Sequence, residues 1–248
     1  MKLIKDNQMN ECDLLEWQKN AIEAFKKRMS DKINPFPCIP ATQASLLGHL
    51  RYGFVGDPRN DETSVMLAPL LKEFSLNYKD YGKNTSLIVF FDTPPSLIST
   101  GSIENFERLF WEQLCQLNRL DEREWPLTIP ENPENHQWEF CFHGERYFMY
   151  CATPLHKYRN SRYFPYMMLA ITPRRVLQEF NKNEKYARKI KQLIHKRLEG
   201  YDEVPIHPSL NSYGNQDNYE WKQYFLHDDE TELPKCPFLR QIMLENKE

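Results

Sequence analysis

The stretch WEFCFHGERYFMYCAT, residues 138–153, carries the clearest fold signal in the chain. Two apolar and aromatic runs, WEFCF and RYFMYCAT, flank His143-Gly144-Glu145. A glycine in so short a link supplies the positive φ that hairpin turns use. The stretch therefore predicts two antiparallel strands. Outside it, residues 86–91 (SLIVFF) and 167–172 are predicted strands by their length and β-propensity.

Helices are predicted between and around these strands. Apolar residues at helical spacing place them at 11–29, at 63–79 with a break near Pro69, at 103–117 behind an N-capping Ser102, and from Pro173 to about residue 198. Residues 38–58 are predicted to be loop and short strand. The order strand, helix, hairpin, strand, helix predicts an α+β fold: a single domain with a mostly antiparallel central sheet, covered by helices, and an N-terminal helix.

Length and composition restrict the class of protein. The 248 residues can bury one continuous core. A net charge of −3 from interspersed signs disfavours a nucleic acid partner. No run approaches the roughly 20 apolar residues of a membrane span, and the polar N-terminus lacks a secretory signal, so we expect a cytoplasmic protein without a membrane partner. Six cysteines without a CxxC pair predict thiols rather than disulfides or structural zinc.

Several common chemistries lack their motifs. The eight glycines never form GxGxxG or GxxxxGK[ST], so no bound nucleotide of those types is predicted. Electrons or hydride would have to come from a separate protein. The chain also has neither a GxSxG elbow nor an HExxH helix, which removes the usual support for a hydrolase.

The first candidate site is YCATPLHKYRNSRYF, residues 150–164. His156 could bind a metal or iron, or act as a general base, because neutral imidazole carries a lone pair near physiological pH. Arg159 and Arg162 could hold carboxylates through bidentate bonds. The alternative is a solvated loop in which the histidine caps a turn and the arginines form surface pairs worth less than about 1 kcal/mol.

The second candidate site consists of Cys38 in PFPC and Cys236 in KCPF. A neighbouring proline fixes the local chain, and a basic neighbour such as Lys235 would lower the pKa of a thiol from its usual value of about 8.5. Either thiolate could bind a soft metal or a haem iron. More often, a cysteine of this kind is a small buried hydrophobic residue.

The third candidate site is NYEWKQYFLHDD, residues 218–229. The ring faces of Trp221 and Tyr224, with the carboxylates of Asp228 and Asp229, could bind a cationic amine or guanidinium. The alternative, which the pattern favours somewhat, is an amphipathic helix that packs its rings inward and ends in a charged turn. The basic residues 182–197 carry a helical apolar stripe, and we expect them to form a solvated face.

Five blocks in order resemble the YqcI/YcgG family: FPC (36–38), LRYGF (50–54), TPLHKYRNSRYF (153–164), DNYEWKQYFLHDD (217–229) and CPF (236–238). On this resemblance, residues 36–240 form the family-like core and residues 1–35 an N-terminal helix and linker. The resemblance implies a haem-dependent monooxygenase that hydroxylates a nitrogen of an arginine-like guanidino or amine substrate. It also implies an external reductase or ferredoxin as electron donor, and a homodimer is possible.

The resemblance gives the candidate residues their roles. A non-covalent haem b is expected, because the chain has no CxxCH signature. His156 is the first choice for the iron ligand, with Cys38 and Cys236 as rivals. Arg51, Arg159 and Arg162 would neutralise haem propionates or a substrate carboxylate. Four residues would enclose the substrate cation, the last three as catalytic candidates: Trp221, Tyr224, Asp228 and Asp229. Two alternatives stay open: a non-enzymatic haem-binding or sensor module, and a haem-free thiol enzyme built on Cys38.

Overall fold

The computed structural model describes residues 2–8, 12–210 and 218–238. Its central sheet has five strands in the order β1-β2-β5-β4-β3. Their bounds are β1 (Arg51–Val55), β2 (Leu87–Phe91), β3 (Phe140–Phe142), β4 (Glu145–Ala152) and β5 (Met168–Pro173). Only β1 and β2 pair in parallel, and the other three pairs are antiparallel. The predicted α+β fold with a mostly antiparallel sheet is confirmed.

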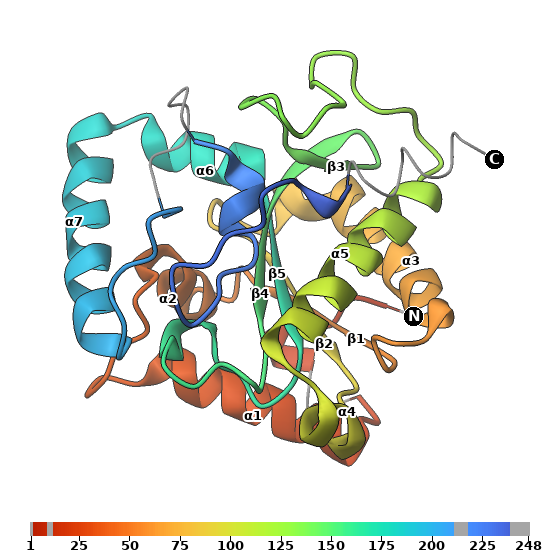
Figure 1. Cartoon of the computed structure of the whole chain (residues 1–248), viewed down its shortest axis with the longest axis horizontal. Helices are drawn as coiled ribbons and strands as arrows, with labels where there is room; N and C mark the ends of the chain where they lie inside the picture. The colour runs from red at the N-terminus through yellow and green to blue at the C-terminus, as the bar shows by residue number, and fades with distance from the viewer. Residues whose placement is uncertain (1, 9–11, 211–217, 239–248) are drawn as a thin grey trace.

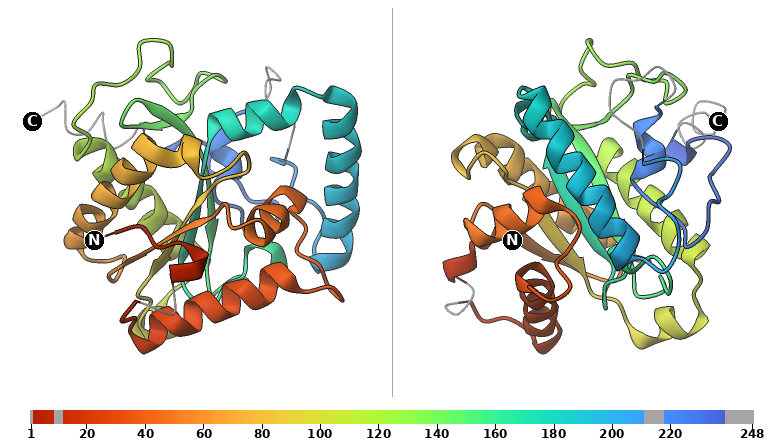
Figure 2. Two further views of the ribbon diagram at one scale, coloured as in Figure 1. Left: turned by 180° about the vertical axis from the view of Figure 1, so that it is seen from behind. Right: turned by 90° about the vertical axis from the view of Figure 1, so that its left-hand side faces the viewer.

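Helices lie on both faces of this sheet (Figures 1 and 2). The α-helices are α1 (Glu16–Ser30), α2 (Ile39–Leu46), α3 (Asp61–Asn77), α4 (Pro95–Thr100), α5 (Ile103–Arg119), α6 (Arg174–Asn181) and α7 (Glu184–Tyr201). The short 3-10 helices are η1 (Asp6–Gln8), η2 (Tyr78–Asp80), η3 (Asn160–Arg162) and η4 (Glu220–Gln223). Helices α3 and α5 cover one face, while α1, α2 and α6 lie on the other, with α7 outside them. The predicted N-terminal helix is α1.

The predicted hairpin joins β3 to β4. His143 and Gly144 both have positive φ, 51° and 77°, so the link uses the left-handed backbone that a glycine favours. The backbone N–H of His143 also donates to Asp121 Oδ2 at 2.7 Å, which anchors the turn to the end of α5. Pairing of Phe140 with Tyr147 sets the register of the two strands.

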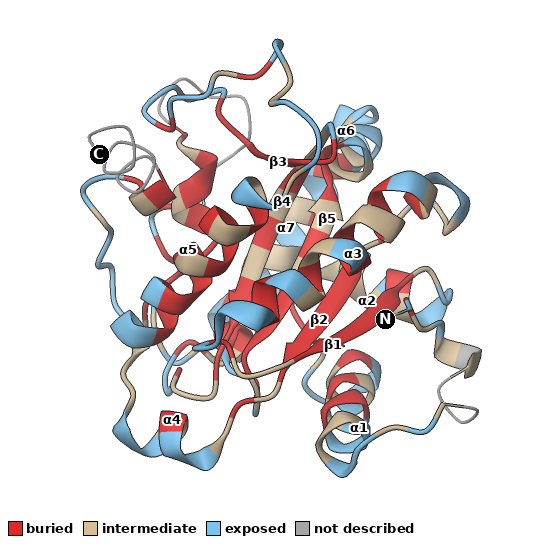
Figure 3. Ribbon diagram, turned by 90° about the vertical axis from the view of Figure 1, so that its right-hand side faces the viewer, coloured by how far each residue is buried: buried red, intermediate tan, exposed pale blue. Residues whose placement is uncertain are grey.

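Strand β2 is buried on both faces, which explains its uninterrupted apolar sequence (Figure 3). Leu87, Val89 and Phe91 belong to the core beneath α3 and α5. Ile88 and Phe90 belong to a second core, which they share with α1. The sheet therefore separates two apolar layers.

Two helical segments differ from the sequence predictions. Pro69 lies inside α3, which continues unbroken through it. The proline removes the N–H partner of the carbonyl of Val65, and Val65 lies on the exposed side of the helix, where water can replace that donor. Residues 39–46 were expected to be loop but form α2. Pro40 lies in its first turn, where a missing N–H leaves no bond unmade.

Helix α7 has the solvated basic face that its sequence predicted. Its buried side chains are Ala187, Ile190 and Leu198, whereas most of its charged side chains are exposed. Among the described residues, no helix is both long and apolar enough to cross a membrane.

Candidate functional site

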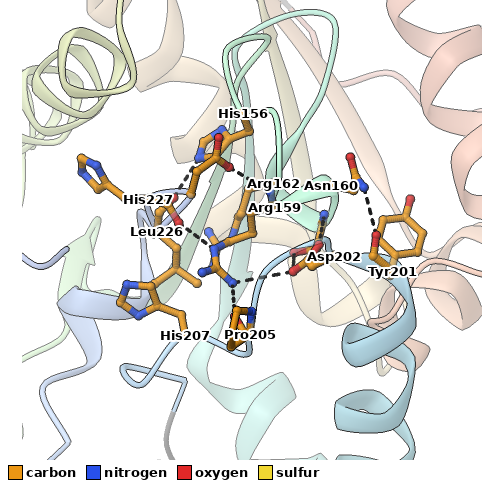
Figure 4. A network of polar contacts seen from close by, with 12 residues as sticks. His156, Arg159, Asn160, Arg162, Tyr201, Asp202, Pro205, His207, Leu226 and His227 are labelled. Atoms are coloured by element: carbon orange, nitrogen blue, oxygen red, sulfur yellow. Dashed lines mark hydrogen bonds and ion pairs between the residues drawn. The ribbon is translucent and has the colours of Figure 1, made fainter. Parts of the chain in front are cut away.

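The loop between β4 and β5 contains the first predicted site and closes on itself. The backbone N–H of Thr153 donates to the carbonyl of Arg162 at 3.0 Å, and the N–H of Phe164 donates back to Thr153 at the same distance. Helix η3 forms the far side of the loop. Side chains of the loop therefore point across to the segments at 202–207 and 223–229 (Figure 4).

Both ring nitrogens of His156 are hydrogen-bonded. Nε2 lies 2.8 Å from the carbonyl of Leu226, so it must be the donor, and Nδ1 then accepts from the hydroxyl of Thr153 at 2.9 Å. The side chain is 2% exposed, and burial lowers the pKa of its imidazole to about 4. His156 is thus a neutral ring that links the loop to the C-terminal segment. To bind iron, it would have to give up one of these bonds.

Arg159 is fully buried and joins three segments. Its guanidinium donates to the carbonyls of His227 at 2.6 Å, Pro205 at 3.1 Å and Asp229 at 3.2 Å. Asp202 lies 3.7 Å away and compensates the charge. Burial lowers the pKa of the guanidinium, and Asp202 is the largest opposing influence.

Arg162 satisfies carbonyls of the same C-terminal segment. It donates to Tyr224 at 2.9 Å, to Gln223 at 2.8 Å and to Cys151 at 3.3 Å, while its guanidinium lies over the ring of Tyr150 at 4.3 Å. Neither Arg159 nor Arg162 is the exposed surface arginine of the alternative interpretation.

The four predicted substrate residues lie at this same junction. The carboxylate of Asp228 accepts from the backbone N–H groups of Lys157 and Arg159, at 2.8 and 2.9 Å. Asp229 accepts from Thr231 in a local turn, at 2.8 Å. The hydroxyl of Tyr224 donates to the carbonyl of Tyr147 at 3.1 Å. The rings of Trp221 and Tyr224 are buried, as the alternative expected, although only the four-residue η4 is helical here.

The structure thus gathers His156, Arg159, Arg162 and Asp228, with Tyr224 and Asp229 beside them, but places Arg51, Cys38 and Cys236 elsewhere. Arg51 is the first residue of β1 and is buried; its guanidinium lies over the ring of Tyr81 at 3.8 Å and donates to the carbonyls of Leu50 and Gly48. Cys236 is buried in the core beneath α3 and α5. Cys38 lies on the opposite face of the sheet from α3 and α5.

Cys38 lines an apolar cavity of about 170 Å³, here called the Cys38 cavity. Side chains of the sheet, including Ile88, Tyr150 and Ala170, form its floor, and α1 and α6 contribute further walls. Cys38 is the N-cap of α2. Burial raises the pKa of its thiol, and a hydrogen bond from the backbone of Ala41 lowers it by a smaller amount.

A larger cleft of about 480 Å³, here called the basic cleft, lies on the other side of α2 and α6. It is lined by five residues between positions 78 and 84 and by residues of α2, α6 and α7. Three of its lining side chains are cations, Lys79, Lys83 and Arg175, and one is an anion, Glu179. Nothing in the sequence marks these residues, because each has the pattern of ordinary surface charge along the chain.

Comparison with known proteins agrees with the resemblance. The YqcI/YcgG family matches residues 25–239. This chain belongs to the YqcI/YcgG family. It is 50% identical to the Bacillus subtilis (strain 168) protein YqcI over 231 residues, which covers 93% of this chain and 91% of that protein. It is also 50% identical to YcgG of the same strain over 226 residues, 91% of this chain and 89% of YcgG. Both carry the name "Uncharacterized protein".

A more distant relative carries a functional name. The chain is 28% identical over 242 residues to a Streptomyces lavendulae protein named "Putative N(omega)-hydroxy-L-arginine synthase DcsA". The match covers 96% of this chain and 89% of that protein. No solved structure gives a significant match to the chain.

Proposed function

We propose that this chain is an N-hydroxylase of an arginine-like guanidino or amine compound. The observation that carries the proposal is the match with the S. lavendulae relative, which extends over nearly the whole of both chains. In the reaction, one oxygen atom of O₂ enters an N–H bond, and the other takes up two electrons and two solvent protons and leaves as water. The two electrons come from a separate reductase or ferredoxin, since the sequence has no flavin or nicotinamide fingerprint.

Haem is the proposed cofactor, and the donor chemistry of the Cys38 cavity fits it. The cavity combines apolar walls with one thiol, a ligand that favours O–O cleavage on a bound iron. Its volume of about 170 Å³ is below the roughly 300–1,000 Å³ of ordinary ligand pockets, so the thiol fits the role of ligand but the cavity in this structure is too small for the macrocycle. Cys38 is the ligand that we favour. His156 is the second choice, because both of its ring nitrogens already form hydrogen bonds within the protein.

The chain's own residues would support such a cofactor in two ways. The backbone N–H of Ala41, which faces the thiol of Cys38, would donate to the thiolate and stabilise it. Apolar side chains such as Ile88 and Leu177 would exclude water from the reacting nitrogen. Haem, when bound, supplies the oxygen activation.

Haem titration of the purified protein tests the cofactor. We expect a stoichiometric Soret band and, in the reduced carbon monoxide complex, a band at about 450 nm for a thiolate ligand rather than about 420 nm for imidazole. Cys38→Ala should shift or abolish the Soret band. Cys12→Ala, which changes a cysteine of the N-terminal segment, is the control and should leave it unchanged. A band that moves in His156→Ala but not in Cys38→Ala would transfer the ligand role to His156.

Product analysis tests the reaction. The haem-loaded protein, with a ferredoxin system as reductant, should add one oxygen atom to L-arginine or a related guanidine, detected by mass spectrometry. Haem binding without oxygen consumption on a panel of guanidines and amines would instead identify a haem carrier or sensor. Absence of haem binding together with rapid alkylation of Cys38 would favour a thiol enzyme.

A further inference from the structure

The basic cleft differs in charge from the chain that surrounds it. The whole chain carries a net charge of −3, yet three cations and one anion line this cleft. The anion, Glu179, already binds Lys182 at 2.6 Å. Lys79 lies 3.9 Å from Glu145. Within the described part of the chain, neither Lys83 nor Arg175 forms an ion pair.

Two adjacent arginines at the start of α6 have opposite environments. Arg174 points inward, where it is paired with the buried carboxylates of Glu139 and Glu220. Arg175 points into the basic cleft, where its guanidinium lies beside the hydroxyl of Tyr78. The charge of Arg174 is therefore compensated within the protein, whereas the charge of Arg175 is available to an anionic ligand.

The remaining walls of the basic cleft suit a small amphipathic molecule. Side-chain amides of Gln43 and Asn84 offer donors and acceptors, and the rings of Phe180 and Tyr186 offer apolar surface. The volume of about 480 Å³ lies within the roughly 300–1,000 Å³ that hold small ligands. A carboxylate matches the planar guanidinium of Arg175 through two parallel hydrogen bonds.

The basic cleft and the Cys38 cavity share two walls. On α2, Pro40 and Gln43 line the cleft, while Ala41 lines the cavity. On α6, Val176 lines the cleft and Leu177 the cavity. Helices α2 and α6 therefore separate a ligand held in the cleft from the Cys38 cavity.

We infer that the basic cleft binds the carboxylate of an amino-acid substrate through Arg175 and Lys83. This inference rests on the proposed function for the identity of the other end of the substrate, the guanidino group. The substrate class is then a free α-amino acid with a guanidino side chain, rather than a decarboxylated guanidine.

L-arginine and agmatine are the matched probes, because agmatine lacks only the carboxylate. Isothermal titration calorimetry should show L-arginine binding to the wild-type protein at least about tenfold tighter than agmatine. Arg175→Gln and Lys83→Gln should each weaken L-arginine binding about tenfold and leave agmatine binding unchanged. Arg188→Gln removes an exposed cation of α7 that does not line the cleft, and it should change neither affinity.

Several results would overturn the inference. These are equal binding of both probes, no binding of either, unchanged discrimination in Arg175→Gln, or binding of inorganic phosphate without L-arginine, which would assign the cleft to a phosphate ligand. The titration is run with and without haem. L-arginine discrimination without any N-hydroxylated product would keep the carboxylate site and reject the proposed function. If Arg175→Gln hydroxylates L-arginine with the same KM as the wild-type protein, the proposed function is kept and the carboxylate site is rejected.

Discussion

Two regions that contain candidate residues use their polar groups differently. In the first, the side chains of His156, Arg159 and Arg162 bond to backbone carbonyls of the C-terminal segment. In the second, the thiol of Cys38 and the guanidinium of Arg175 line cavities. The region with the denser polar motif in the sequence is therefore the one whose hydrogen-bonding groups are already used within the protein.

The C-terminal segment explains why the first region needs so many donors. Between residues 218 and 236, only η4 is regular secondary structure, so most carbonyls there lack a helix or sheet partner. Buried carbonyls need donors, and a guanidinium offers five. Arg159 and Arg162 provide them for four residues of this segment: Gln223, Tyr224, His227 and Asp229.

The largest expected difference between the two regions is in how much an arginine of each contributes to the free energy of unfolding. Arg162→Met should lower the free energy of unfolding by about 3–5 kcal/mol, because it removes the charged donor that bonds to the buried carbonyls of Gln223, Tyr224 and Cys151. Arg175→Met, in the basic cleft, should change it by less than about 0.5 kcal/mol. Urea unfolding followed by circular dichroism measures both.

The pair of variants also has an outcome that contradicts the comparison. Equal unfolding midpoints for Arg162→Met and Arg175→Met would mean that Arg162 contributes no more to folding than an exposed arginine. Its guanidinium would then be as available to a ligand as that of Arg175, and the sequence-based role at a propionate or carboxylate would gain support.

The next effect is a pH dependence that His156 contributes. Its pKa is about 4 in the folded protein and about 6.5 when unfolded, so the unfolded chain binds more protons between these values. Stability from this residue is therefore complete above about pH 6.5 and falls by about 2–3 kcal/mol as the pH drops to about 4. His156→Asn should remove this part of the acid-side slope, measured by urea unfolding at a series of pH values.

His227 provides the matched control, because its pKa shifts the other way. A hydrogen bond from Nε2 to Glu107 at 2.9 Å raises the pKa of His227. Its contribution to stability is present below its unfolded pKa and is lost as the pH rises through the folded value. His227→Asn should keep the acid-side slope of the wild-type protein. An unchanged slope in His156→Asn would show that its imidazole is not held neutral by burial.

The sequence predicted the sheet well because its signals are local. The hairpin depends on a glycine turn between adjacent runs, and β2 on five consecutive apolar residues. Helix α5 depends on Ser102 and the spacing that follows it, and the capping box at Ser102 is present. Short helices such as α2 lack enough turns to show a periodicity, so they were missed.

The candidate site was harder to predict because its contacts are long-range. The bond between His156 and Leu226 joins residues 70 positions apart, and nothing near His156 in the sequence indicates it. The basic cleft likewise combines Lys83 with Arg175, from the turn after η2 and the start of α6. Polar groups that bond to the protein can be distinguished from those that face a cavity only in the folded structure.

The smallest expected effect concerns the reactivity of Cys38. Burial raises the pKa of its thiol, so at pH 7.5 iodoacetamide should alkylate it about tenfold more slowly than glutathione. It should still react faster than Cys115, whose pKa burial raises to about 12 and which lies in the core beneath α3 and α5 rather than on the Cys38 cavity. Peptide mass spectrometry of timed samples gives each rate. If Cys38 reacts faster than glutathione, its thiolate is already stabilised without a metal, and the thiol-enzyme alternative gains over the haem ligand.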